Sequence, residues 1–231
     1  ESLMQHVLES YTVEADNLKI QVNIAQYSGK LPFYELVVPS VSSAMQALLD
    51  DIRHLLITDV TISASEILDP KAVIGLKKKF SIRSNEILQQ RLPHLDYETR
   101  SFLVGMLLHE MMGLGKVEFL LNDGNLEEVV INSASEPVRV YHKKYGWLVT
   151  NVNLTNESQI QNYANIIARR VGRQITTLDP LLDAHLITGD RANAALYPIA
   201  TKGNTITIRK FVRDPWTVTD FITNKTSTAE I

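Results

Sequence analysis

The sequence predicts an α+β protein, in which an N-terminal helical bundle with a small β element precedes an α/β domain with a mixed or antiparallel meander sheet packed by helices. Two observations carry this prediction. From Ser42 onward, apolar residues recur at spacings of three and four, which is typical of amphipathic helices. After residue 125, short β-rich runs alternate with turn residues, which is typical of antiparallel strands.

Composition narrows the classes of protein that fit. The chain has 231 residues and 45% hydrophobic content, enough for a real core in one or two domains. Acidic residues outnumber lysine and arginine by 26 to 23, which argues against nucleic acid as the main partner. The absence of cysteine excludes disulfides and thiolate metal sites and fits a reducing cytosol. No apolar run approaches the ~18 residues of a membrane helix, and a signal-peptide pattern is absent.

The first half predicts a few strands and then helices. The runs 18–27 and 34–39 are expected to form a small edge sheet. A helix from Ser42 carries one apolar stripe, consisting of Met45, Leu48, Leu49, Ile52, Leu55 and Leu56. A second helix is expected over 84–91. A third runs from an Asp96 N-cap through Met112, with Gly113 as its stop. Its inward residues are predicted to be Phe102, Leu103, Met106, Leu107 and Met111.

The second half predicts a meander, a helix and a hairpin. Strands are expected at 127–131, 137–142 and 147–152, separated by short turns. Asn156 is the expected N-cap of the next helix, which Gly172 ends. The inward face of this helix is predicted to hold Ile160, Tyr163, Ile167 and Val171. The hairpin follows at 187–211.

Three regions are predicted along the chain: a mainly helical N-terminal subdomain (1–112), an α/β domain (113–211), and a linker with the start of a further domain (212–231). The pattern breaks near 112–120 and again at Arg213-Asp214-Pro215. The chain starts without methionine and stops just after a helix-start signal, so we expect it to be a piece of a longer protein.

Two short motifs invite a catalytic interpretation that their spacing does not support. The stretch His109–Gly113 begins like a zinc-protease helix but lacks the second histidine, so no metal site is expected there. The stretch Gly113–Lys116 resembles the end of a phosphate loop. However, the chain lacks the first glycine of that motif and the serine or threonine that follows its lysine. A helix that a glycine stops before a strand is the simpler interpretation.

The hairpin carries an arginine on the polar face of each strand. In the first strand, Arg191 lies on the face opposite to that of the apolar alanines. In the second strand, Arg209 lies on the face opposite to that of the isoleucines. A turn centred near Thr201 would put Arg209 opposite Asn193 and diagonal to Arg191, about 7 to 8 Å away. Such neighbours repel unless an anion or carboxylates lie between them. Two interpretations stay open: Asp183, Asp190 or solvent satisfies the arginines, or they share a polyphosphate.

Collinear blocks over residues 112–222 resemble the N-terminal region of the type II/IV secretion ATPase superfamily, and most of all its archaeal secretion, pilus and archaellum branch. The resemblance covers about half the chain and is looser over the first ~110 residues. Its blocks are 112–115, LLNDGNLEEVVIN (120–132), VRVYHKKYGWLVTNV (138–152), ARRVGRQI (168–175), DPLLDAHLITGDR (179–191) and TKGNTITIRKFVRDPWTVTDFI (201–222). Where the family often has Asp-Gly-Ser-Arg, this chain has Thr188-Gly189-Asp190-Arg191.

This resemblance implies a hexameric ATPase whose C-terminal RecA-like domain carries the Walker motifs. ATP with magnesium would bind in the cleft between the two domains of the longer protein, whereas this stretch alone should hold no cofactor and hydrolyse nothing. Arg191 and Arg209 would be the catalytic arginines that reach the phosphates. Linker residues Phe211 and Arg213 would lie near the adenine.

The implied partners are the protein's own C-terminal domain, the neighbouring subunits of a homohexamer, and a membrane platform protein. The implied location is the cytoplasm, at the inner face of the cell membrane. Two alternatives remain: a non-catalytic adaptor or docking module for such a platform, and a stand-alone anion-binding protein built on the hairpin.

Overall fold

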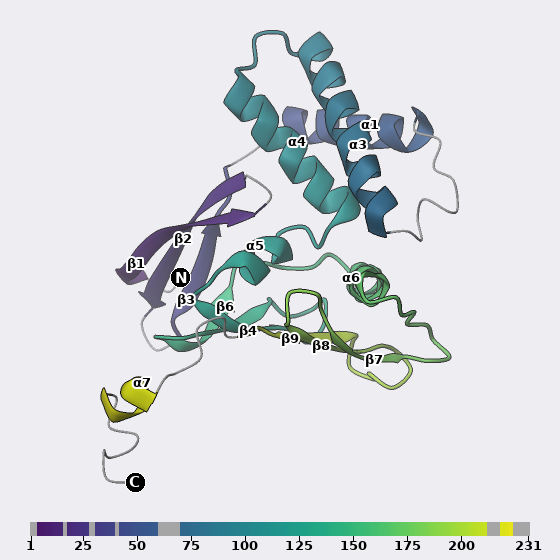
Figure 1. Cartoon of the computed structure of the whole chain (residues 1–231). Helices are drawn as coiled ribbons and strands as arrows, with labels where there is room; N and C mark the ends of the chain where they lie inside the picture. The colour runs from purple at the N-terminus through teal and green to yellow at the C-terminus, as the bar shows by residue number, and fades with distance from the viewer. Residues whose placement is uncertain are drawn as a thin grey trace.

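A single mixed sheet of nine strands forms the body of the protein, with helices on one of its faces (Figure 1). The strand order is β1-β2-β3-β6-β5-β4-β9-β8-β7, which confirms the α+β prediction. The computed structural model describes residues 4–15, 18–27, 31–39, 42–59, 70–211 and 218–223.

The strands are β1 (Met4–Ala15), β2 (Leu18–Tyr27), β3 (Phe33–Val37), β4 (Leu126–Ile131), β5 (Arg139–His142), β6 (Gly146–Thr150), β7 (Leu181–His185), β8 (Arg191–Ala195) and β9 (Thr205–Arg209). The helices are α1 (Ser43–Asp59), α3 (Pro70–Arg91), α4 (Tyr97–Met112), α5 (Val117–Asn122), α6 (Glu157–Arg170) and α7 (Val218–Thr223). None of the described helices is both long and apolar enough to cross a membrane.

The N-terminal strands form one end of the large sheet. β1, β2 and β3 pair antiparallel, and β3 then pairs parallel with β6 through Phe33 opposite Val149. The strands expected at 18–27 and 34–39 are therefore confirmed as β2 and β3, but the prediction of a small edge sheet was wrong, because both strands belong to the nine-stranded sheet, whose edge strand here is β1. β1 was missed because its sequence alternates only weakly.

Local signals placed two helices correctly. Asp96 caps α4 by accepting a hydrogen bond from the Thr99 backbone N–H (2.8 Å), and Gly113 ends the helix. Asn156 caps α6 in the same way through Gln159 N (2.9 Å). The predicted faces hold: Leu103, Leu107, Ile160, Tyr163 and Ile167 are buried, whereas Phe102, Met106, Met111 and Val171 are partly buried.

Two predictions about helices were wrong. α3 begins at Pro70 rather than at Ser84, because packing of Leu76 and Phe80 stabilises a stretch whose Gly75 and lysine run weaken the helical pattern. The glycines of 113–116 lead into α5 rather than into a strand. A short apolar run does not distinguish helix from strand by periodicity, and this one buries Phe119 and Leu120 as a helix.

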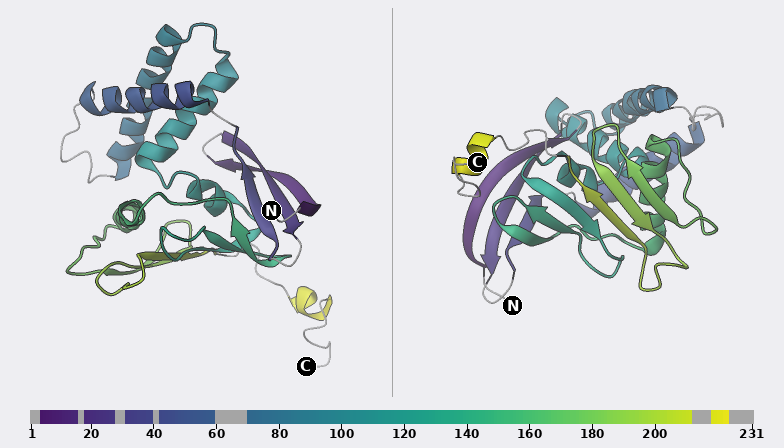
Figure 2. Two further views of the ribbon diagram at one scale, coloured as in Figure 1. Left: turned by 180° about the vertical axis from the view of Figure 1, so that it is seen from behind. Right: turned by 60° about the horizontal axis from the view of Figure 1, so that its bottom comes forward.

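Two hydrophobic cores hold the molecule together. The larger lies between the sheet and the helices α5 and α6, and the smaller lies among α1, α3 and α4 (Figures 1 and 2). The apolar stripe predicted for α1 faces the smaller core, where Leu49, Ile52 and Leu56 are buried. The two parts meet where Gly105 of α4 lies against Leu18 of β2, so closely that an added Cβ would be 2.6 Å from Leu18 Cδ2. The predicted region boundaries at 112 and 211 stay predictions.

The second half of the sheet contains the expected meander. β4, β5 and β6 pair antiparallel in sequence order. β9 adds to the other side of β4, β8 to β9, and β7 to β8.

Candidate functional site

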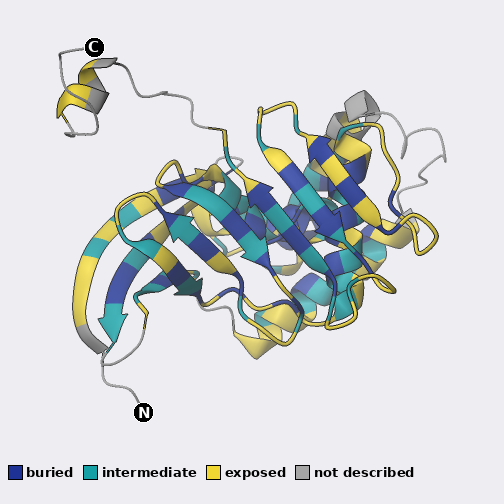
Figure 3. Ribbon diagram, turned by 90° about the horizontal axis from the view of Figure 1, so that it is seen from below, coloured by how far each residue is buried: buried dark blue, intermediate teal, exposed yellow. Residues whose placement is uncertain are grey.

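Among the described residues, none covers one face of the strands β4, β9, β8 and β7, which is called the open face below. In Figure 3, which views the molecule from below, these strands lie in front, and α5 and α6 lie on the opposite side of the sheet. Ala192, Ala194, Ile206 and Ile208 are buried on the helix side. Arg191 and Arg209 alternate with them and are exposed, so the predicted shared polar face is confirmed.

The register brings the arginines closer together than the sequence predicted. Arg191 is directly opposite Arg209, and Asn193 is opposite Thr207. The predicted diagonal arrangement was wrong because the connection between the strands is centred on Ala200 rather than on Thr201. Directly opposite residues in a sheet have Cβ atoms about 4.5 to 5.5 Å apart. The two arginine side chains are therefore attached at directly neighbouring positions of the sheet.

The connection from β8 to β9 is fixed by a hydrogen-bonded asparagine. Asn204 Oδ1 accepts from Tyr197 N (2.8 Å), which closes the loop on itself. Asn204 N donates to Glu157 Oε2 (2.6 Å), and Asn204 Nδ2 donates to the Glu157 carbonyl (3.1 Å). Glu157 begins α6, so the loop is fastened to the helix behind the sheet. These contacts set the register, and no turn motif in the sequence indicates them.

Arg191 has a carboxylate partner. Its Nε donates to Asp183 Oδ1 (3.1 Å) and its Nη2 to Asp183 Oδ2 (2.9 Å), a two-pronged arrangement on neighbouring strands. The Arg191 hydrogen bonds hold the pKa of the Asp183 carboxyl below its ordinary value. Both side chains are more than half exposed, so the pair orients Arg191 more than it stabilises the fold.

Arg209 differs from Arg191. Within the described part of the chain it has no hydrogen-bond or ion-pair partner, although Glu128 of β4 is the residue opposite it. Asp190, the other expected partner, is engaged elsewhere. Within the first interpretation, a carboxylate satisfies Arg191 through Asp183, whereas Arg209 is exposed to solvent.

The arginines belong to a row that crosses the sheet. Residues opposite one another in successive strands are His185 (β7), Arg191 (β8), Arg209 (β9), Glu128 (β4) and Tyr141 (β5). Sequence reasoning did not identify His185 and Glu128 because their place in the row depends on strand register. β7 itself was not predicted as a strand.

The turn between β7 and β8 contacts Phe211, which follows the last strand of the hairpin. Asp190 Oδ1 accepts from Phe211 N (2.7 Å), and Asp190 Oδ2 accepts from Thr188 Oγ1 (2.7 Å). Gly189 has a φ of 91° and lies against the Phe211 ring, so that a Cβ there would be 3.1 Å from Phe211 Cγ. The Phe211 side chain is 63% exposed beside this turn. The predicted site residue Arg213 lies outside the described residues.

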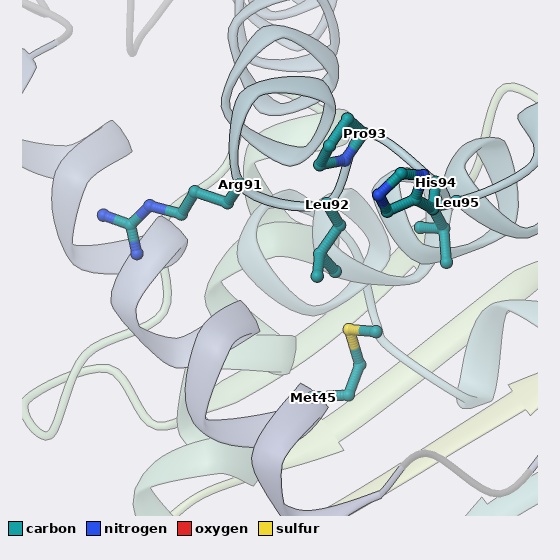
Figure 4. Close-up of a pocket in the computed structure, with 6 residues that line it drawn as sticks. All are labelled: Met45, Arg91, Leu92, Pro93, His94 and Leu95. Carbon is teal, nitrogen blue, oxygen red and sulfur yellow. The ribbon is translucent and has the colours of Figure 1, made fainter.

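The described part of the surface includes two hollows of similar size. One of about 330 Å³ is lined by residues of β7, β8 and β9 and includes Asp183. The other, of about 280 Å³, lies in the helical part and is shown in Figure 4. Its lining is mostly apolar and consists of Met45, Arg91, Leu92, Pro93, His94 and Leu95. Arg91 is ion-paired with Asp51, so it is not directed at a ligand.

The histidine of the motif that resembles a zinc-protease helix lies in the interior. His109 is 3% exposed, and its ring centroid is 5.3 Å from that of Phe119. A search of the described residues for three or more clustered histidine, cysteine, aspartate or glutamate side chains finds none that could hold a metal.

No protein-family model matches the chain. Three curated relatives, all from Methanocaldococcus jannaschii, are named as uncharacterized proteins. MJ0781 is 30% identical over 94% of this chain, MJ1288 is 28% identical over 71%, and MJ0900 is 30% identical over 58%. The chain spans 28%, 63% and 24% of the lengths of these relatives, respectively.

Among solved structures, the VirB11 ATPase of the Brucella suis type IV secretion system, in complex with sulphate, is similar to part of the chain. The match covers 46% of this chain and 32% of that protein, at 24% identity and a TM-score of 0.39. A likeness at that level carries no argument about function.

Proposed function

We propose that this chain is the nucleotide-facing N-terminal part of a longer ATPase that powers protein secretion or the assembly of a pilus-like filament or archaellum. The observation that carries the proposal is the pair Arg191 and Arg209, which lie directly opposite each other on an open sheet face. The collinear sequence blocks around this pair support the assignment to secretion ATPases.

The arrangement suits phosphate chemistry. Guanidinium groups donate hydrogen bonds to phosphate oxygens in a two-pronged geometry, and arginines placed at the transferred phosphoryl group raise rates by about 10³ to 10⁵. Asp183 holds Arg191 in one orientation, whereas Arg209 can turn toward an incoming anion. In the longer protein a RecA-like domain would supply ATP and magnesium, which neutralises phosphate charge.

In the proposal, the residues that follow β9 lead toward that domain. Phe211 lies two residues after Arg209 and is held by the backbone hydrogen bond to Asp190. In the proposal Phe211 and Arg213 lie near the adenine, and Arg191 and Arg209 contact the phosphates. Closure of the two domains on the nucleotide would then move this sheet as a rigid body.

The proposed partners are the C-terminal domain of the same chain, neighbouring subunits of a homohexamer, and a membrane platform protein on the cytoplasmic side. The alternative is a non-catalytic adaptor that docks on such a platform. The two proposals differ in the sequence they require after Ile231: the ATPase needs a G-x-x-x-x-G-K-[ST] phosphate loop within several tens of residues, and the adaptor does not.

ATP turnover by the full-length protein and by the 231-residue chain tests the proposal. We expect turnover by the full-length protein and none by the chain. Turnover by the chain alone would contradict the assignment of the Walker motifs to another domain. A full-length protein that binds the platform but lacks both the loop and ATP turnover would favour the adaptor.

A further inference from the structure

We propose that His185 is the third member of the anion-binding row, so that His185, Arg191 and Arg209 together bind a polyphosphate chain rather than a single phosphate. The inference rests on the proposed function in taking a nucleotide triphosphate as the natural ligand. The row itself can be tested on this chain without ATP hydrolysis.

The geometry follows from two strand registers. His185 of β7 is opposite Arg191 of β8, and Arg191 is opposite Arg209 of β9. All three side chains are exposed on the open face. Because neighbouring strands are about 4.8 Å apart, the row spans about 10 Å from its first to its third backbone position. A single phosphate can reach two adjacent members, and a longer chain of phosphates can reach all three.

The charges along the row favour an anion. Like charges directly opposite each other in a sheet are destabilising, and Arg191 and Arg209 are such a pair. The carboxylate of Asp183 contacts Arg191, and Glu128 is the residue opposite Arg209 on β4. Within the described part of the chain, neither carboxylate forms an ion pair with Arg209. An added anion would therefore find a cation that is not neutralised.

Asp183 lies beside the row rather than in it: it is opposite Asn193 of β8, two residues before His185 on β7, and it contacts Arg191. It accepts both hydrogen bonds from Arg191, and the nearby charges of His185 and Arg173 add to the effect of Arg191 in lowering its pKa. This carboxylate thus pairs with Arg191, the middle member of the row, in the absence of ligand. A polyphosphate must compete with it there, whereas binding at Arg209 meets no such competitor among the described residues.

The donors match phosphate oxygens. Each arginine offers a planar fork of N–H donors, and an imidazole offers at least one N–H donor. His185 should therefore add affinity only when the ligand is long enough to reach from Arg209 past Arg191. Dependence on phosphate chain length is the signature of a three-member row.

Calorimetric titration of the 231-residue chain with orthophosphate, pyrophosphate and tripolyphosphate at low salt tests the inference. We expect tripolyphosphate to bind more tightly than pyrophosphate by about threefold, the size expected for one additional hydrogen bond. His185→Ala should remove this increment and leave pyrophosphate binding unchanged. His185→Arg should enlarge it.

A matched control places the same charge elsewhere on the same strand. Leu181 is on the same face of β7, four residues or about 13 Å from His185. Leu181→Arg should leave the ratio of tripolyphosphate to pyrophosphate affinity at its wild-type value. An equal gain from Leu181→Arg and His185→Arg would mean that net charge, not the row, determines binding and would overturn the inference.

The variant Asp183→Asn provides a second test, in which the inference predicts a gain rather than a loss of binding. Removing the competing carboxylate should tighten tripolyphosphate binding by about threefold. A different result is that Arg209→Ala weakens the binding of both pyrophosphate and tripolyphosphate, while His185→Ala and Asp183→Asn leave the affinity for both unchanged. The site would then be the arginine pair alone, and the proposed function would still stand. If none of the phosphates binds to the chain, the row is not an anion site, and ATP turnover by the full-length protein then decides the proposed function separately.

Discussion

At the scale of single residues, the turn Thr188-Gly189-Asp190 determines where the chain leaves the last strand. The Asp190 carboxylate holds both the Phe211 backbone and the Thr188 hydroxyl. Gly189 allows the turn to approach the Phe211 ring with a positive φ. Asp190, which directly precedes Arg191, therefore has a structural role: it fastens Phe211, two residues after β9, to the turn before β8.

Gly189→Ala should destabilise the protein by about 1 to 3 kcal/mol, because a Cβ would meet the Phe211 ring in a backbone conformation that side chains rarely adopt. The urea midpoint measures the effect. Gly124→Ala is the control, since a Cβ at Gly124 meets nothing within 4 Å. Equal midpoints for the two variants would show that the turn is not held as described.

His142 should make stability depend on pH. Burial lowers its pKa, although the charges of Asp123 and Glu9 oppose this effect. Because the folded pKa lies below the ordinary value of about 6.5, the unfolded chain takes up the proton first as pH falls. The stabilisation is complete above about pH 6.5 and is lost as pH falls toward the folded pKa.

His142→Asn tests this effect, since an amide oxygen can replace Nδ1 as the acceptor of the Lys144 N–H (3.0 Å) but cannot titrate. When the pH is lowered from 7.5 to 5.5, the urea midpoint of unfolding should fall further in the wild type than in the variant. The same fall in both proteins would mean that other groups cause the acid sensitivity.

At the scale of elements, Glu157 connects three parts of the second half. Its carboxylate accepts from Ala134 N in the loop after β4 (2.7 Å) and from Asn204 N in the loop before β9 (2.6 Å). The helix α6 therefore fixes both the meander and the hairpin that carries the arginines. The arginine row depends on this contact through the register of β8 and β9.

Glu157→Ala should cost about 2 kcal/mol of unfolding free energy, because two backbone donors lose a charged acceptor. Glu136→Ala serves as the control, since its exposed carboxylate makes only long contacts of 3.4 and 3.5 Å. Chemical denaturation compares the two. A larger loss in the control than in Glu157→Ala would contradict the assigned role.

Sequence patterns found the elements with local signals and missed the relations between distant ones. The caps Asp96 and Asn156 located two helices because capping acts within one turn. The register of β8 against β9 was missed because Asn204 sets it through a residue 47 positions away in the chain. Glu128 entered the candidate site, and His185 the row, only with the paired strands in view.

At the scale of the whole molecule, two cores stabilise the helical part and the sheet separately. Leu88 of α3 is fully buried in the core among α1, α3 and α4, and Leu148 of β6 is buried in the core between the sheet and the helices α5 and α6. The helical part and the sheet touch closely at Gly105 and Leu18. Local loss of stability in one core should therefore spread incompletely to the other.

Leu88→Ala should destabilise its core by about 2 to 5 kcal/mol and lower amide hydrogen-exchange protection more in α1, α3 and α4 than in the strands. Leu148→Ala should give the opposite distribution. Uniform loss of protection throughout the chain in both variants would show that the two cores unfold as one unit.

The central claim is that the arginine pair faces a nucleotide, and Arg209→Ala in the full-length protein tests it most directly. Within the described residues this substitution breaks no ion pair, so a slower reaction reflects the lost contact with phosphate. We predict that single-turnover ATP hydrolysis at saturating ATP falls by about 10³-fold in Arg209→Ala, with a loss in Arg191→Ala as well. Arg139→Ala, which removes an exposed arginine paired with Glu136 on the same sheet, should leave the rate unchanged. Wild-type rates in both Arg191→Ala and Arg209→Ala would contradict the claim.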